Sequence, residues 1–163
     1  MSGHSDWITS ATTLGKSEML ATGSTDKTIR IWNCGSRQCV HVLSGTTSWI
    51  SCVAMVRAFA PIVLSGSGER NVRLWDVDTE SCISALDGHD HTVSGLATHT
   101  NPENDESLEI FTSSWDGFLR VYKFDVSNIA QIKPSATGRD HRKIDDSKEA
   151  KPSSIWDEDD LLE

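Results

Sequence analysis

Apolar and polar residues alternate in three separate parts of this chain, and in each part a short polar turn interrupts the alternation. Residues 62–76 read IVLSGSGERNVRLWD, with an apolar run before the turn and alternating residues after it. Residues 19–33 and 110–123 repeat this arrangement as MLATGSTDKTIRIWN and IFTSSWDGFLRVYK. A period of two residues on both sides of a tight turn is typical of a β-hairpin. The pattern therefore predicts three hairpins of similar construction.

The three hairpins share further positions, which indicates an internal repeat. Each turn holds an acidic residue, and an aromatic residue follows six positions later, giving the pairs Asp26 and Trp32, Glu69 and Trp75, and Asp116 and Tyr122. A glycine precedes each hairpin, at positions 3, 45 and 88, so that successive glycines lie 42 and 43 residues apart. A period of roughly 40–45 residues with Gly-His near its start and Trp-Asp near its end marks a WD40 blade. The chain resembles the WD40-repeat family over about residues 3–132.

The resemblance implies an all-β fold, a partial WD40 β-propeller of three four-stranded antiparallel blades. The blades are expected at about residues 3–44, 45–87 and 88–132. Their strands are expected at residues 7–12, 19–24, 28–32, 38–43, 50–56, 62–67, 72–76, 82–86, 93–98, 110–114 and 118–123, with a weaker last strand within 125–132. Residues 100–109, which read TNPENDESLE, are expected to form a long acidic loop of the kind on which repeat proteins differ in their partners.

Beyond residue 132 the alternation ends, and residues 133–163 are expected to form a disordered acidic tail. At its end, Trp156, Leu161 and Leu162 flank four consecutive acidic residues. This arrangement resembles a short acidic and hydrophobic motif that a partner protein captures. It also fits the acidic dileucine pattern read by sorting adaptors. A tail that only adds solubility is the alternative.

Length, charge and cysteine content limit which classes of partner and which cellular compartment we expect. The length of 163 residues suits one domain, and the net charge of −9 opposes binding to a nucleic acid backbone. No apolar run approaches the ~18–20 residues of a membrane helix, and the N-terminus lacks the basic and apolar segments of a signal peptide. The four cysteines form no Cys-x-x-Cys pair and are expected as buried thiols at strands or strand ends. We therefore expect neither a nucleic acid nor a membrane as partner, and a location in the cytoplasm or nucleus.

The polar residues that recur in each repeat have a structural interpretation through the resemblance. In WD40 blades the histidine after the glycine, a hydroxyl residue on the second strand, the turn acid and the third-strand tryptophan form a buried hydrogen-bonded tetrad, in which all polar groups are satisfied. The resemblance assigns this role to His4, Thr22, Asp26 and Trp32, to Ser65, Glu69 and Trp75, and to His89, Thr112, Asp116 and Tyr122. The second repeat has Thr46 in place of histidine, so its blade is expected to be the least well fixed.

Other readings of these residues are less favoured. Histidine, hydroxyl and carboxylate also make up a hydrolytic triad, but no oxyanion site or cleft is indicated, so no catalytic residue is assigned. The histidines show neither helical i,i+4 spacing nor a nearby cluster of carboxylates and cysteines, so no metal site is expected, and no cofactor. The arginine that recurs on the third strand, at positions 30, 73 and 120, is expected to pack its stem between blades rather than to form a basic stripe.

Three tryptophans are the candidates for contact with a partner. In WD40 propellers the Gly-His loop and the turn between the second and third strands lie on one face, and Trp7, Trp49 and Trp115 fall there by alignment of the repeats. Trp115 takes the turn position that Thr25 and Gly68 take in the other repeats, where a large side chain has no evident packing purpose. Exposed aromatic residues on such a rim are typical interface anchors. Burial in the core is the alternative for Trp7 and Trp49.

Three blades cannot close a propeller, which uses about four to eight. We expect self-association, a partner protein that supplies further blades, or a chain that is a fragment of a longer protein, because open ends expose apolar surface. The sequence thus predicts a non-enzymatic interaction scaffold or adaptor subunit that binds other proteins. The alternatives are a peptide or modification reader, a hydrolase using His4 or His89, and a substrate-recruiting subunit of a ubiquitin ligase. The last of these lacks the expected Trp-Asp-x-Arg, since the chain has Trp-Asn-Cys-Gly at 32–35 and Trp-Asp-Val-Asp at 75–78.

Overall fold

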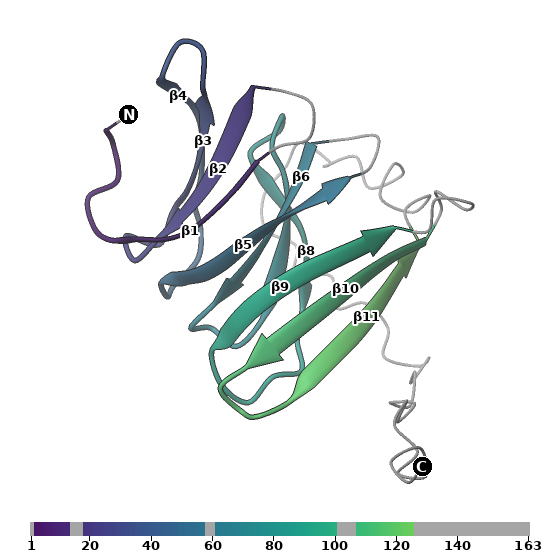
Figure 1. Cartoon of the computed structure of the whole chain (residues 1–163). Coiled ribbons are helices and arrows are strands. Elements are labelled where there is room, and N and C mark those ends of the chain that lie inside the picture. The colour runs from purple at the N-terminus through teal and green to yellow at the C-terminus, as the bar shows by residue number, and fades with distance from the viewer. Residues whose placement is uncertain (1, 14–17, 58–60, 101–106, 126–163) are drawn as a thin grey trace, which may run out of the picture.

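The computed structural model describes residues 2–13, 18–57, 61–100 and 107–125, and all of its regular structure is β-strand (Figure 1). Eleven strands form three antiparallel sheets within these residues. The sheets follow one another along the chain and pack side by side, from β1 to β4 at one end to β9 to β11 at the other (Figure 1). The prediction of an all-β partial propeller is confirmed. No helix in the described part of the chain is long and apolar enough to cross a membrane.

Each sheet is a blade whose strands are hydrogen-bonded in chain order. Blade one contains β1 (Ile8–Thr13), β2 (Met19–Ser24), β3 (Ile29–Asn33) and β4 (Gln38–Leu43). Blade two contains β5 (Ile50–Arg57), β6 (Pro61–Ser67), β7 (Val72–Asp76) and β8 (Ser81–Leu86). Blade three contains β9 (Val93–Thr100), β10 (Ser107–Ser114) and β11 (Leu119–Asp125).

Most strand boundaries agree with the sequence-based expectation to within one or two residues, but two expectations were wrong. β9 extends through Thr100 and β10 begins at Ser107, so both ends of the predicted acidic loop at 100–109 belong to strands. Of the four cysteines, only Cys52 is buried, while Cys34 and Cys82 are exposed, because strand ends lie at the edges of the blades. The fourth strand expected within 125–132 falls outside the described residues, apart from Asp125, which ends β11.

The register of the strands identifies equivalent positions in the three blades. Thr22 on β2 pairs with Arg30 on β3, and the same pairing joins Ser65 to Arg73 and Thr112 to Arg120. A bulge follows the first pair of the first two strands in each blade, whose first-strand members are Ile8, Ile50 and Val93. Residues that hold one place in the repeat can therefore be compared directly across the blades.

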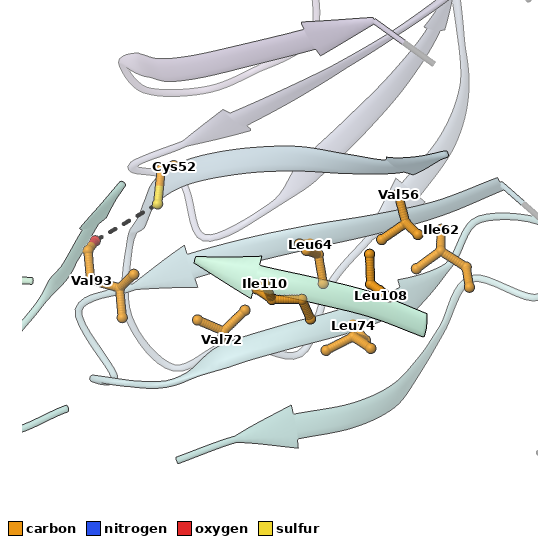
Figure 2. Close-up of a cluster of buried hydrophobic side chains, with 9 residues drawn as sticks. All are labelled: Cys52, Val56, Ile62, Leu64, Val72, Leu74, Val93, Leu108 and Ile110. Atoms are coloured by element: carbon orange, nitrogen blue, oxygen red, sulfur yellow. Dashed lines mark hydrogen bonds between the residues drawn. The ribbon is translucent and has the colours of Figure 1, made fainter. Parts of the chain in front are cut away.

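The apolar core lies between the blades. One buried cluster joins blade one to blade two through Ile29, Ile31, Ile50, Val63 and Trp75. The other joins blade two to blade three, and Figure 2 shows the residues of β10 facing those of β6 and β7: Leu64, Val72, Leu74, Leu108 and Ile110. Each side chain of these clusters that is fully buried removes apolar surface from water on folding, worth roughly 1.5–3 kcal/mol. Blade-to-blade packing is thus the main source of stability, and it fixes one rim formed by loops and turns.

Candidate functional site

The rim contains two kinds of segment, the loop that leads into the first strand of each blade and the turn between its second and third strands. One backbone hydrogen bond ties them together in every blade. Thr25 N donates to Trp7 O at 2.9 Å, Gly68 N to Trp49 O at 3.1 Å, and Trp115 N to Thr92 O at 3.0 Å. Trp7, Trp49 and Thr92 therefore hold equivalent places, as do the three turn residues that donate to them.

In blade one, four side chains form a continuous hydrogen-bonded chain. Trp32 Nε1 donates to Thr22 Oγ1 at 2.8 Å, and that oxygen lies 2.7 Å from His4 Nε2. On the other side of the ring, His4 Nδ1 lies 2.8 Å from Asp26 Oδ2. Because an ionised carboxylate only accepts, the imidazole proton is on Nδ1, and the Thr22 hydroxyl donates its own proton to Nε2. Both ring nitrogens of His4 are thereby used within the blade.

The carboxylate of Asp26 is held in its charged form. Burial alone would raise its pKa, but hydrogen bonds from Thr28, His4 and the Ser5 amide outweigh burial and place the pKa well below its ordinary value. Thr28 contributes through its hydroxyl at 2.7 Å and its amide at 3.0 Å. The charge of Asp26 thus fixes the imidazole tautomer and closes the turn at the same time.

Blade three repeats the hydrogen bonds among the acid, the histidine and the threonine of blade one, but not the bond from the third-strand aromatic residue. His89 lies 2.7 Å from both Asp116 Oδ2 and Thr112 Oγ1. Burial alone would raise the pKa of Asp116, but hydrogen bonds from the Phe118 amide and from His89 lower it well below its ordinary value. The phenol of Tyr122 does not join the chain; it donates to Asp87 O at 3.2 Å. The prediction that Tyr122 completes a tetrad was therefore wrong, because the phenol oxygen lies farther along the side chain than the indole nitrogen.

Blade two keeps one bond of the tetrad and gives its acid another role. Trp75 Nε1 donates to Ser65 Oγ at 2.8 Å, as in blade one. Glu69 turns away from this pair, accepts hydrogen bonds from the amide and hydroxyl of Thr47, and pairs with Arg73 at 3.0 and 2.8 Å. Burial alone would raise the pKa of Glu69, but these bonds lower it. Thr47 follows the histidine position as Ser5 does in blade one, so its amide bonds Glu69 just as the Ser5 amide bonds Asp26. The assignment of Glu69 to a tetrad was nevertheless wrong, because Thr46 stands where a histidine would link the acid to Ser65, and Glu69 pairs with Arg73 instead.

The recurring arginine has no single role. Arg73 is paired with Glu69, and its guanidinium lies 6.0 Å from the centre of the Trp75 ring. Arg30 and Arg120 each have a buried Nε without a hydrogen-bond partner among the described residues. All three side chains are partly buried, which matches a stem packed against the blade rather than a free basic stripe.

Two of the three candidate tryptophans meet on the rim between blades two and three. The rings of Trp49 and Trp115 lie 6.0 Å apart between centroids, and the ring of His91 lies 5.6 Å from Trp115. We call Trp49, His91 and Trp115 the rim aromatic cluster. Trp115 is 62% exposed although it has two aromatic neighbours. A β-carbon on Gly68 would lie 2.8 Å from Trp49 Nε1, so the glycine in that turn leaves the space that the indole fills.

The remaining candidates lie elsewhere. Trp7 is 80% exposed on blade one and makes no ring contact within the described residues. Trp156, Leu161 and Leu162 fall outside the described part of the chain. His91 was not predicted as a site residue, since its contact with Trp115 depends on how two rim segments meet in space. Its place two residues after His89, in a rim loop, was the one signal available.

The described residues hold no group of three or more histidine, cysteine, aspartate or glutamate side chains that could bind a metal ion. A comparison with protein families supplies the remaining finding. The family described as "WD domain, G-beta repeat" matches residues 1–33, 37–76 and 80–123, which together make up more than half of the chain. The first match covers β1 to β3, the second runs from β4 to β7 and the third from β8 into β11, so each later match includes the last strand of the preceding sheet. The chain belongs to the WD40 family of WD-domain, G-beta-repeat proteins.

Proposed function

We propose that this chain is a non-catalytic adaptor whose rim aromatic cluster binds another protein, as part of a larger complex in the cytoplasm or nucleus. WD40 repeats form protein-interaction scaffolds, and proteins built from them are generally non-catalytic. The observation that carries the proposal is the exposure of Trp115 at a turn position where the other blades have threonine and glycine. Its indole offers a large apolar surface that the blade itself does not use.

The cluster is ordered in advance of binding. The amide of Trp115 is fixed by Thr92, and its ring is placed between those of Trp49 and His91. An anchor whose rotamer is already restricted loses little conformational entropy when a partner covers it. Tryptophan is also among the residues that most often dominate the binding free energy of an interface. A rigid, exposed tryptophan therefore suits this rim to protein recognition.

The tetrad histidines support the non-catalytic part of the proposal. A general base needs a free ring nitrogen within reach of a substrate proton. In His4 and His89 both ring nitrogens are engaged, by an aspartate and a threonine, and both side chains are almost completely buried. These histidines hold the blade together and present no nitrogen to a substrate.

The test uses a photo-cross-linking amino acid in place of Trp115 and, as matched control, in place of Thr25, the equivalent turn residue of blade one. We expect a partner protein cross-linked from position 115 and not from position 25. With that partner purified, Trp115→Ala should weaken binding at least tenfold, since interface hot spots contribute about 2 kcal/mol or more. Equal cross-linking from both positions, or an unchanged dissociation constant, would contradict the proposal.

A further inference from the structure

A second surface, separate from the rim, lies on the flat side of blade three. In blades one and two the side that faces the next blade, here called the trailing face, is covered. Ile29 and Ile31 of blade one, and Val72 and Leu74 of blade two, are at most 1% exposed. The register places Leu119 and Val121 of blade three at the same positions. They are 68% and 44% exposed.

The chain itself shows twice what occupies a trailing face. Blade two covers blade one with the first residue of β5, Ile50, and blade three covers blade two with the first residue of β9, Val93 (Figure 2). Hydroxyl groups join each pair: Thr9 Oγ1 donates to Ile50 O at 2.6 Å, and Ser51 donates to Val93 O. The occupant in both cases is another blade, whose first strand lies against the face together with side chains of its next strands, such as Val63 of β6 and Ile110 of β10.

The corresponding hydroxyl of blade three belongs to Ser94, the residue after Val93, as Ser51 follows Ile50. Ser94 Oγ lies 3.2 Å from Ser113 Oγ on the neighbouring strand and is exposed. It is thus in the place from which the other two blades bind the carbonyl group of the next blade. Together with Leu119 and Val121, it gives blade three both the apolar and the polar parts of a blade-docking surface.

One position differs, and it decides which blade fits. Gly23 and Gly66 hold equivalent positions on β2 and β6, and Ser113 takes that position on β10. A β-carbon on Gly23 would lie 2.5 Å from Ile50 Cγ2, and one on Gly66 would lie 2.7 Å from Val93 Cγ1 as well as 2.6 Å from Cys52 Sγ of its own blade. These distances are shorter than carbon atoms tolerate, so glycine is required wherever the next blade brings a β-branched residue to this point.

Blade three has exchanged the two members of this cross-strand pair. Blade one pairs Ser10 with Gly23, whereas blade three pairs Gly95 with Ser113. A second copy of this chain would bring Ile8, the equivalent of Ile50 and Val93, against the β-carbon of Ser113. Ile8 is 58% exposed and so is free for such a contact, but its γ-methyl group would collide with Ser113.

We infer that the trailing face of blade three docks a four-stranded β-blade of a partner protein that has glycine, alanine or serine opposite Ser113, and that Ser113 excludes a second copy of this chain. The β-carbons of Ile50 and Val93 would lie 3.3 and 3.0 Å from the added carbon. A side chain without γ-methyl groups therefore fits after a shift of a few tenths of an ångström. Ser113 acts as a specificity residue, since a steric clash against the wrong partner is one way in which interfaces discriminate.

The test measures self-association of the full 163-residue chain by sedimentation equilibrium, with a second copy as the probe. The wild type should associate at least tenfold more weakly than the exchanged variant Gly95→Ser/Ser113→Gly, which restores the pairing of blade one. Ile8→Ala should strengthen association similarly, because it removes the same clash from the other side. Combining the two changes should give no further gain.

Controls separate this surface from other effects. Leu119→Asp in the exchanged variant should return association to the wild-type level, and Ser36→Gly, in an exposed turn of blade one, should leave it unchanged. Trp115→Ala should also leave it unchanged, so a failure here is distinct from a failure of the rim proposal. Because Ile8 is largely exposed, Ile8→Ala keeps the fold even if the exchanged variant does not.

Three outcomes would overturn the inference. Wild-type association as tight as that of the exchanged variant would show that Ser113 excludes nothing and that a second copy is the occupant. No association in any variant that melts cooperatively would show that the face does not dock a blade. A loss of thermal stability on Leu119→Asp in the wild-type chain would show that the chain covers this face itself, and would also refute it.

Discussion

The tetrad of blade one offers the sharpest test of what holds a blade together, through the change Asp26→Ala. The carboxylate accepts hydrogen bonds from His4 Nδ1 at 2.8 Å, from the Ser5 amide at 3.1 Å, and from the amide and hydroxyl of Thr28 at 3.0 and 2.7 Å. Its side chain is only 6% exposed. Alanine removes all of these bonds at once and provides no acceptor in their place.

The expected loss of unfolding free energy depends on which of these donors can form a hydrogen bond with water instead. The ring of His4 is 3% exposed, and without the carboxylate its Nδ1–H keeps only the Thr28 hydroxyl, at 3.4 Å, as a weak acceptor, which costs about 1–3 kcal/mol. The Ser5 amide is exposed and can bind water instead, while Thr28 is only partly exposed. Hydrogen bonds to a charged group contribute about 1.5–3 kcal/mol each but do not add fully when they share one acceptor. We therefore expect Asp26→Ala to lower the free energy of unfolding by about 3–4 kcal/mol.

Glu69→Ala is the matched change in blade two, and its cost should be smaller. Its donors, Thr47 and Arg73, are both more accessible to water than His4; the Arg73 side chain is 22% exposed. Partly exposed ion pairs contribute little, commonly below about 1 kcal/mol, and the Thr47 bonds add a similar amount. The expected loss is about 1–2 kcal/mol.

Urea denaturation followed by tryptophan fluorescence measures both losses at constant pH. The slope of the free energy with urea should stay unchanged, so that the midpoint reports stability alone. Asp26→Asn serves as a further comparison, because it keeps one acceptor oxygen and should fall between wild type and Asp26→Ala. Equal midpoints for Asp26→Ala and Glu69→Ala would refute the reasoning that the lost carboxylate partner of a buried imidazole N–H dominates the cost.

Three other changes probe the pH dependence, the rim and a turn. Burial alone would raise the pKa of Asp26, but its hydrogen bonds lower it below the ordinary 3.8. The stability that Asp26 contributes is therefore present above about pH 4 and is lost as the pH falls. The free energy of unfolding should decrease between about pH 5 and 3 less steeply in Asp26→Asn than in wild type. Trp115→Ala should change the melting temperature by no more than about 3 °C, since the side chain is largely exposed, and a larger drop by calorimetry would place it in the core. Gly117→Ala should lower the free energy of unfolding, measured with urea, by about 1 kcal/mol, because a φ of 84° is unfavourable for alanine although no atom lies near the added β-carbon. An unchanged midpoint would show that the turn relaxes.

The hairpins and the order of the strands could be predicted because they depend on local alternation and on turn residues. Glycine and polar residues ended the strands within one or two residues of the expected places. The extent of β9 and β10 was missed, since Glu109 and Ser107 are polar and lie in a stretch whose composition favours a loop. Strand pairing with β11 overrides that local preference.

Except for His91, the members of the candidate site were predictable, but their contacts were not. The repeat aligned Asp26 with Glu69 and Trp32 with Tyr122, but alignment says nothing about the reach of a side chain. Glu69, one methylene longer than Asp26, pairs with Arg73, and the position of the phenol oxygen takes Tyr122 to Asp87. Such differences of an ångström or two are set by the surrounding packing, which the sequence of one blade does not contain.

The departures from the repeat are themselves informative, because blades built on one frame need the same residues at the same places. Where a blade breaks that rule without improving its own packing, the reason is expected to lie in function. Blade three breaks it twice within three residues: Ser113 replaces a glycine that close packing of the next blade requires, and Trp115 replaces a small turn residue and stays exposed. Ser113, near the end of β10, alters the flat face, and Trp115, in the turn that follows, alters the rim. The two proposals therefore depend on two neighbouring positions of blade three, and the variants of each position test them separately.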